Sequence, residues 1–300
     1  MRGGSEPRAV IVTRRSEYEL LLLRHGTHEQ ARFFLETRDQ DIEVVRERHE
    51  TFLKAREAVT RGIPASWRRS SVDRIDLDRF LFEPGDIVVA IGQDGLVANT
   101  AKYLDGQVVV GINPDPDMYE GVLVPHAPKG IEALLRSALE EDAPIEARSM
   151  VEAKLDDGQS LVALNEIFIG HCSHQSARYQ IAWAGARERQ SSSGILVSSG
   201  TGATGWAKSV YRGRDCDFDL PCATERRLVF FVREAWPSVS TETDLCDGDL
   251  DEDEELAVTS EMDGGGVIFG DGIEEDRIEF SYGRRATIGI AQKRLLLLAA

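Results

Sequence analysis

The stretch DIVVAIGQDGLVANTAKYL, residues 86–104, decides how the first part of this 300-residue chain is organised. Its opening DIVVAI is almost continuously apolar, as expected of a strand that is covered on both faces. The turn Gly92-Gln93-Asp94-Gly95 follows, and LVANTAKYL fits a helix. A buried strand that turns on glycines into a helix predicts one unit of a parallel α/β sheet.

The neighbouring segments repeat this alternation. RAVIVT (8–13) predicts a strand, and residues 27–60 predict one or two amphipathic helices. QVVVGINPDP (107–116) predicts a second buried strand, and GIEALLRSALEED (130–142) a further helix. Residues 1–145 therefore predict an α/β domain with a parallel sheet.

After Pro144 the pattern changes to short stretches of mostly alternating apolar and polar residues, such as ARYQIAWAG and DRIEFSYG, separated by turn residues. Their spacing is typical of an antiparallel sandwich. The sequence thus predicts an α/β domain followed by an all-β domain, with a boundary near residue 145.

Composition limits the function. The formal net charge of −17 excludes nucleic acid as a partner, because an acidic surface repels a phosphate backbone. No run approaches the length of a membrane helix, and no targeting segment is recognised, so the expected location is the cytoplasm. The four cysteines form no C-x-x-C pair and are expected to be reduced.

The turn at Asp94 is the first candidate site. In open α/β sheets, ligands bind beyond the carboxyl ends of the strands, and glycines let backbone N–H groups approach phosphate. A carboxylate placed there suits the task of accepting a proton from a hydroxyl that attacks a nucleoside triphosphate. The alternative is a plain turn in which Asp94 caps the following helix.

Two further segments carry polar residues that call for partners. ALNEIFIG (163–170) places Asn165 and Glu166 in an otherwise apolar strand, where a ribose diol and a carboxamide would satisfy them; a salt-bridged structural Glu166 is the alternative. SSGILVSSGTGATGWAKSV (192–210) alternates glycines with hydroxyl residues. It predicts either a loop that approaches a ligand closely or a plain flexible loop.

Together these segments resemble the NAD kinase family. That family carries an aspartate-glycine turn written GGDGT, an Asn-Glu pair in a strand and a threonine-glycine loop written TxTGSTAY, in this order. The matching segments here are residues 92–96, 165–166 and 201–206. The similarity spans roughly residues 85–285 and resembles most the divergent mitochondrial-type branch, through ALNEIFIG, SSSG, GINPDP with EGVL, and MDGGGVIFGDG.

The resemblance implies a Rossmann-like α/β domain over 1–145, an antiparallel β-sandwich substrate domain over 146–280, and a C-terminal segment, 281–300, that packs back on the first domain. It implies a kinase that transfers the γ-phosphoryl group of ATP, with Mg²⁺ as cofactor, to the 2′-hydroxyl of the adenosine ribose of NAD, which gives NADP. NAD and ATP are then the partners, and a homodimer or homotetramer is implied by analogy.

The same resemblance assigns the site residues. Asp94 corresponds to the general base, and Gly92 and Gln93 correspond to the loop that holds the donor phosphates. No metal ligand from the protein is assigned. The residues that correspond to the NAD-binding set are Gly95, Asn165, Glu166, Thr201, Thr204, Gly205, Trp206 and Ser209.

Several positions depart from the family pattern. Gln93 replaces a glycine, Leu96 replaces a threonine, and Ser193 stands where an aspartate is usual. The side chain of Gln93 either obstructs the donor phosphates or donates its amide to them, and Leu96 removes a hydroxyl. Two other functions therefore stay open: a non-catalytic NAD- or nucleotide-binding protein on a kinase scaffold, and a kinase of another hydroxylated acceptor, a lipid or a sugar.

Two remaining motifs have simpler interpretations. GHCSH (170–174) offers two histidines and a cysteine, but three candidate ligands on one loop rarely close a zinc site, so a surface loop is expected. MDGGGVIFGDG carries Asp263 and Asp271 beside glycines and predicts two tight turns of a hairpin. The family resemblance implies that one of these turns lies near the substrate.

Overall fold

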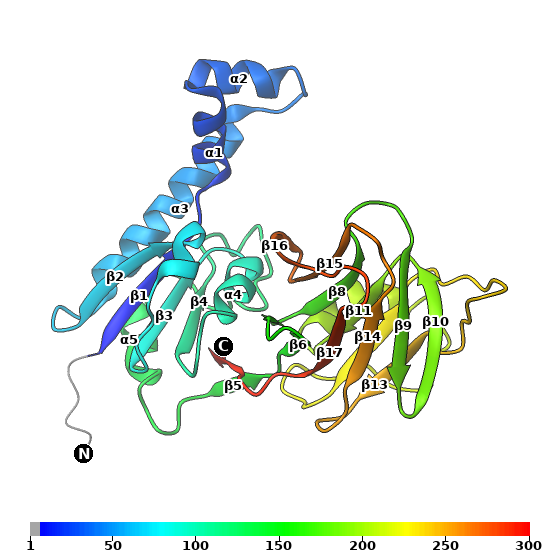
Figure 1. Cartoon of the computed structure of the whole chain (residues 1–300). Helices are drawn as coiled ribbons and strands as arrows, with labels where there is room; N and C mark the ends of the chain where they lie inside the picture. The colour runs from blue at the N-terminus through cyan, green and yellow to red at the C-terminus, as the bar shows by residue number, and fades with distance from the viewer. Residues whose placement is uncertain (1–6) are drawn as a thin grey trace. The chain divides into compact units, whose positions relative to one another are not determined.

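The computed structural model describes residues 7–300, which divide into two compact units (Figure 1). Unit 1 comprises the described residues up to Glu146 together with Leu296–Ala300, and unit 2 is Ala147–Leu295. The returning C-terminal segment is shorter than the expected 281–300. Residues 281–295 belong to unit 2, because β17 (Arg285–Ile290) pairs there with β6 (Val151–Leu155).

Unit 1 is built on a sheet in the order β2-β1-β3-β4-β18-β5. The strands are β1 (Arg8–Thr13), β2 (Arg68–Asp73), β3 (Asp86–Ile91), β4 (Val108–Ile112), β18 (Leu295–Leu298) and β5 (Ile145–Arg148). The first five in this order pair in parallel. The chain builds outward to β2 on one side of β1 and to β3 and β4 on the other, so the topological switch point lies between β1 and β3.

Helices cover this sheet. α3 (Ile42–Gly62) and α5 (Ile131–Ser137) share one hydrophobic cluster with alternate residues of β1, β3 and β4. The two helices approach closely at Gly62, where a Cβ atom would lie 2.2 Å from Cγ2 of Ile131. Val88 and Ala90 alternate with the clustered residues of β3 and are equally buried, so β3 is covered on both faces as its apolar sequence predicts.

Two short helices precede the long one. α1 (Glu17–His25) begins with a capping box between Ser16 and Glu19, and α2 (His28–Glu36) is capped by Thr27. Both pack on the N-terminal part of α3 around a small core of their own that includes Leu21, Leu35 and Val45. Figure 1 shows these helices reaching away from the sheet of unit 1, while the C-terminal half of α3 runs back to it.

Unit 2 is an antiparallel β-sandwich, as the sequence predicts. One sheet has the order β10-β9-β14-β17-β6-β7 and the other β13-β12-β11-β8-β15-β16. Their inner faces share one large hydrophobic cluster, which includes Tyr179, Phe230 and Phe280. The remaining strands are β7 (Ser160–Ala163), β8 (Glu166–His171), β9 (Ala177–Trp183), β10 (Ala186–Ser192), β11 (Ile195–Ser198), β12 (Leu228–Val232), β13 (Asp247–Leu250), β14 (Leu256–Ser260), β15 (Gly266–Gly270) and β16 (Ile273–Glu279).

Candidate functional site

Asp94 is the first residue of α4 (Asp94–Ala101), three residues after β3 ends, and its side chain is half-buried. The carboxylate does not cap its own helix. Its Oδ1 accepts a hydrogen bond from the backbone N–H of Leu123 at 2.8 Å, and its Oδ2 accepts one from the N–H of Val122 at 3.1 Å. The Asp94 side chain therefore ties the start of α4 to the segment that follows β4. The two backbone N–H donors fix the position of the carboxylate.

The glycines beside Asp94 play different parts. The N–H of Gly92 donates to the carbonyl of Ile112 at 3.0 Å, which ties the end of β3 to the end of β4. A Cβ atom at Gly92 would lie 3.2 Å from Cδ2 of Leu96. Gly95 is exposed, and a Cβ atom there would meet nothing within 4 Å. Backbone approach by a ligand is thus open at Gly95.

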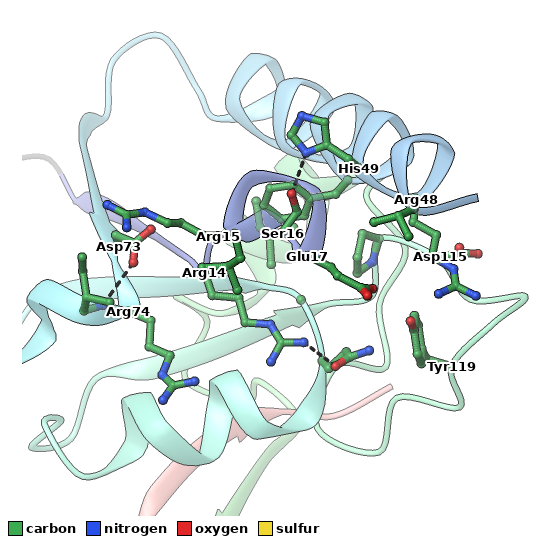
Figure 2. A pocket seen from close by; sticks show the side chains of 18 residues that line it. Arg14, Arg15, Ser16, Glu17, Arg48, His49, Asp73, Arg74, Asp115 and Tyr119 are labelled. Atoms are coloured by element: carbon green, nitrogen blue, oxygen red, sulfur yellow. Dashed lines mark hydrogen bonds between the residues drawn. The ribbon is translucent and has the colours of Figure 1, made fainter. Parts of the chain in front are cut away.

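A pocket of about 630 Å³ lies at the carboxyl ends of the four parallel strands β1 to β4 (Figure 2). Gly92 and Gln93 line it after β3, while Pro114 and Asp115 do so after β4. The basic residues of its lining are Arg14 and Arg15 after β1, Arg74 after β2, and Arg48 and His49 on α3. This is the edge at which open α/β sheets bind ligands.

Gln93 is held by one of these arginines. Its Oε1 accepts a hydrogen bond from Nη2 of Arg14 at 2.5 Å, drawn as a dashed line in Figure 2. Because a guanidinium cannot accept, the amide must turn its oxygen toward Arg14 and leave Nε2 as a donor. Nε2 has no hydrogen-bond partner elsewhere in residues 7–300.

Asn165 lies in the turn before β8 and Glu166 is the first residue of that strand, so the pair lies at a strand end and not in the middle of a strand. β7 ends at Ala163 and β8 begins at Glu166. Asp271 stabilises the turn through two hydrogen bonds. Its Oδ1 accepts one from the N–H of Asn165 at 2.6 Å, and its Oδ2 accepts one from the N–H of Leu164 at 3.0 Å. Neighbouring side chains can serve one ligand at such a strand end, where the alternation of a regular strand no longer applies.

Glu166 is ionised less readily than an ordinary glutamate. Burial, together with the nearby charge of Asp271, raises the pKa of Glu166 to about 7. Among residues 7–300, no lysine, arginine or histidine forms an ion pair with Glu166, so the alternative of a salt-bridged structural carboxylate is not what the structure has. A half-buried, unpaired carboxyl group of this kind is a recurrent feature of binding and catalytic sites.

The glycine-hydroxyl loop packs directly on this turn. Ser199 donates its hydroxyl to the carbonyl of Leu164, and its backbone N–H donates to the carbonyl of Asn165 at 2.9 Å. A Cβ atom at Gly202 would lie 2.3 Å from that same carbonyl oxygen, so only glycine allows the approach. The hydroxyl of Thr201 is buried and has no hydrogen-bond partner in the described residues.

The other predicted residues of the loop lie further along it. Thr204 and Gly205 are exposed, and α6 (Trp206–Tyr211) carries the half-buried Trp206 and the exposed Ser209. The ring of Trp206 stacks on Phe168 with 5.8 Å between centroids, and the guanidinium of Arg233 lies 5.2 Å from the Trp206 centroid. Phe168 and Arg233 therefore both contact the ring of Trp206.

The structure thus forms two groups from the predicted residues. Unit 1 holds Gly92, Gln93, Asp94 and Gly95, and unit 2 gathers the Asn165-Glu166 turn with the start of the 201–209 segment. Sequence reasoning left open whether the turn at Asp263 or the one at Asp271 lies near the substrate, and it overlooked the arginines of the pocket. Two arginines directly after the first strand, RR at 14–15, were the signal available for the latter.

No group of three or more histidine, cysteine, aspartate or glutamate side chains within residues 7–300 is arranged to hold a metal ion. None of the helices in the same range combines the length and the apolar character required to cross a bilayer.

Several known proteins are similar to the chain in sequence. No family model matches it. Curated relatives are an NAD kinase of Methanospirillum hungatei (30% identical over 129 residues), the mitochondrial NAD kinase 2 of Rattus norvegicus (27% over 262) and an NAD kinase of Chlorobaculum tepidum (27% over 178). These alignments cover 42%, 70% and 58% of this chain. They cover 46%, 62% and 61% of the relatives, so the chain spans between about half and three-fifths of their length.

The fold has a solved counterpart. An NAD kinase from Archaeoglobus fulgidus, crystallised in complex with ATP, matches with a TM-score of 0.58 and 16% identity, over 97% of this chain and 93% of that one. The two units are accordingly those of a two-domain scaffold, an α/β domain and a β-sandwich domain. Three curated NAD kinases are similar to the chain in sequence, and a solved NAD kinase shares its fold.

Proposed function

We propose that this chain is an ATP-dependent NAD kinase. The observation that carries the proposal is the placement of Asp94. Its carboxylate is fixed by two backbone N–H groups at the carboxyl edge of a parallel sheet, next in sequence to Gln93, which lines the basic pocket. The family relationship supplies the reaction, in which NAD and ATP give NADP and ADP.

Asp94 would act as the general base. Each carboxylate oxygen has a second lone pair beyond the one that binds a backbone N–H, so it can also accept a ribose hydroxyl. In the reaction the 2′-oxygen forms a bond to the γ-phosphorus, the bond from that phosphorus to ADP breaks, and the hydroxyl proton passes to Asp94. Positioned general bases contribute roughly 10²–10⁴-fold to rate.

The residues of unit 2 would bind NAD. The side-chain amide of Asn165 has no hydrogen-bond partner within residues 7–300, and neither has the buried hydroxyl of Thr201. Glu166 has no cationic partner in that range. Ribose hydroxyls and a carboxamide would satisfy these groups. Gly95, Thr204, Gly205, Trp206 and Ser209 complete the proposed NAD-binding set.

Mg²⁺ would be held mainly through the phosphates of ATP, as this ion commonly is in enzymes that use nucleoside triphosphates. Bound in that way, the ion neutralises charge on the transferring phosphoryl group. The residues nearest in sequence to the base, Gly92 and Gln93, are proposed to contact the donor phosphates.

The test is direct. Purified protein is mixed with NAD, ATP and Mg²⁺, and NADP is measured with an NADP-specific dehydrogenase. Formation of NADP supports the kinase. Tight binding of NAD without turnover would instead favour a non-catalytic binding protein on a kinase scaffold, an alternative that the residues Gln93 and Leu96 keep open. Phosphorylation of a sugar or lipid hydroxyl alone would favour a kinase of another hydroxylated acceptor. Self-association into a dimer or tetramer is part of the proposal and is tested by light scattering.

A further inference from the structure

Asp271 lies in a hairpin turn that does not itself require an aspartate. Asp271 and Gly272 join β15 to β16, with Gly270 paired opposite Ile273. Both turn residues have a positive φ, which is 53° at Asp271 and 68° at Gly272. Two-residue hairpin turns of this kind accept asparagine, aspartate or glycine at the first position. The conformation of the turn therefore does not explain the carboxylate at this position.

The carboxylate of Asp271 is bound instead to the turn between β7 and β8. Its two oxygens accept hydrogen bonds from the backbone N–H groups of Leu164 at 3.0 Å and Asn165 at 2.6 Å. The backbone N–H of Asp271 also donates to the carbonyl of Glu166 at 3.0 Å. One residue thus bonds to three consecutive residues of the turn, and two of them are the Asn165-Glu166 pair.

Ser199 bonds to the same segment through other backbone groups. Its hydroxyl donates to the carbonyl of Leu164, and its N–H donates to the carbonyl of Asn165 at 2.9 Å. The N–H and C=O groups of both Leu164 and Asn165 are therefore bonded, which fixes the path of the backbone. The direction in which the side chains of Asn165 and Glu166 leave the backbone is fixed with it.

Asp271 also acts on Glu166 through its charge. Burial of Glu166 and the nearby charge of Asp271 raise the pKa of Glu166 to about 7, and Asp271 is the one charged residue of 7–300 that contributes to this shift. A carboxyl group that holds its proton near neutral pH can donate one hydrogen bond and accept others. Such a group suits a ribose hydroxyl or a carboxamide.

We propose that Asp271 is a positioning residue for NAD, which acts through the turn 164–166 and sets the direction from which Asn165 and Glu166 reach the dinucleotide. The inference rests on the proposed function, because it takes NAD as the ligand of this pair. It adds a residue that follows Asn165 by more than 100 positions in the sequence and acts through backbone contacts.

The experiment measures binding of NAD to the full-length chain by calorimetry, without ATP. Asp271→Gly keeps a residue suited to the turn and removes the carboxylate. The Kd for NAD should rise about tenfold or more, because the turn 164–166 loses two charge-assisted contacts. Asp271→Asn also suits the turn and keeps one oxygen acceptor, so it should raise the Kd less than Asp271→Gly does.

Ala184→Gly is the matched control. Ala184 and Gly185 form a two-residue hairpin turn between β9 and β10, with φ of 50° and 82°. Ala184 is exposed, and its side chain has no polar atom. The control variant thus makes the same backbone change in the same kind of turn, and it should alter the Kd for NAD by less than about twofold.

Steady-state kinetics separate a positioning role from a general loss of structure. In Asp271→Gly the KM for NAD should rise about tenfold or more, while the KM for ATP and the kcat at saturating NAD stay within about twofold, because the variant weakens only the binding of NAD. An equal fall in kcat, in ATP affinity and in NAD affinity would reflect a loss of folded protein and would overturn the inference.

Two further results would overturn it. One is Asp271→Gly binding NAD as tightly as the unmodified chain, or losing no more affinity than Ala184→Gly. The other is an equal loss in Asp271→Asn and Asp271→Gly, since the loss would then follow the charge and not the contacts.

Failure of the inference is separable from failure of the kinase proposal. Formation of NADP with an unchanged KM for NAD in Asp271→Gly would contradict only the positioning role. Weaker NAD binding in Asp271→Gly, without NADP formation by the unmodified chain, would contradict only the kinase.

Discussion

Replacing Asp94 with asparagine tests whether this side chain acts as a general base or only as a structural clamp, which holds the segment after β4 in place. An asparagine keeps one oxygen to accept from the backbone of Val122 or Leu123, but its NH₂ group faces the other N–H. Leaving one such donor unpaired costs about 1–3 kcal/mol. A domain with a stability of about 5 kcal/mol would then retain about 2 kcal/mol and stay more than nine-tenths folded.

Loss of folding can therefore explain only a small part of any drop in turnover. Loss of a general base lowers turnover roughly 100-fold or more. We expect Asp94→Asn to show such a drop in the coupled NADP assay, with a modestly lower Tm. The drop should lie in kcat rather than in NAD affinity, because the variant removes a proton acceptor and keeps the binding surface.

Asp86→Asn is the matched control for this prediction. Asp86 is a buried carboxylate at the start of β3 that accepts hydrogen bonds from the Nε of Arg8 at 2.8 Å and the backbone N–H of Glu83 at 2.7 Å. Its replacement should lower Tm at least as much and leave kcat within twofold. Turnover of Asp94→Asn above one third of the unmodified value, or an equal loss in Asp86→Asn, would show that Asp94 is a clamp and not a base.

Two further predictions concern unit 2. The pKa of Glu166, raised from 4.5 to about 7, means that the folded chain holds a proton there that the unfolded chain releases, so stability falls as pH rises from about 4.5 to 7. Glu166→Gln should abolish that fall and raise stability at pH 8 by about 3 kcal/mol, seen as Tm against pH; an unchanged pH profile would contradict this account. Gly202→Ala should lower NAD affinity at least tenfold in a titration, because its Cβ would lie 2.3 Å from the carbonyl oxygen of Asn165. Gly213→Ala, with 3.6 Å of space, should bind NAD normally, and equal affinities for the two variants would refute the close approach.

Continuous apolar runs explain why most of the unit 1 sheet could be predicted. β1, β3 and β4 are buried strands whose sequences are apolar apart from their terminal residues Arg8, Thr13 and Asp86. β2, with the sequence RRSSVD, was not predicted, because it is a mostly exposed strand at the edge of the sheet and its neighbour β1 imposes its conformation. α1 was also missed, although Ser16 and Glu19 form the capping box that marks its start.

The residues of the candidate site also divide into those that could be predicted from the sequence and those that could not. The residues of short contiguous motifs, such as Asp94 and the Asn165-Glu166 pair, could be named from the sequence. Asp271 could not be selected, because it lies more than 100 residues from Asn165 and reaches it only through the pairing of β15 with β8, in which Gly270 lies opposite Ile167. The arginines of the pocket could not be grouped from the sequence for the same reason, because Arg48 comes near Arg14 only when α3 folds against the sheet.

The position of β18 has a consequence for how the protein is made. Leu296 and Leu297 pair with β4, yet the ribosome adds them only after the whole of unit 2. Until then β4 presents an open edge with unpaired peptide groups, which is the kind of edge that recruits foreign strands. The sandwich is thus an insertion that must be translated before its host sheet can close, and the time this takes sets how long the nascent chain is exposed to aggregation.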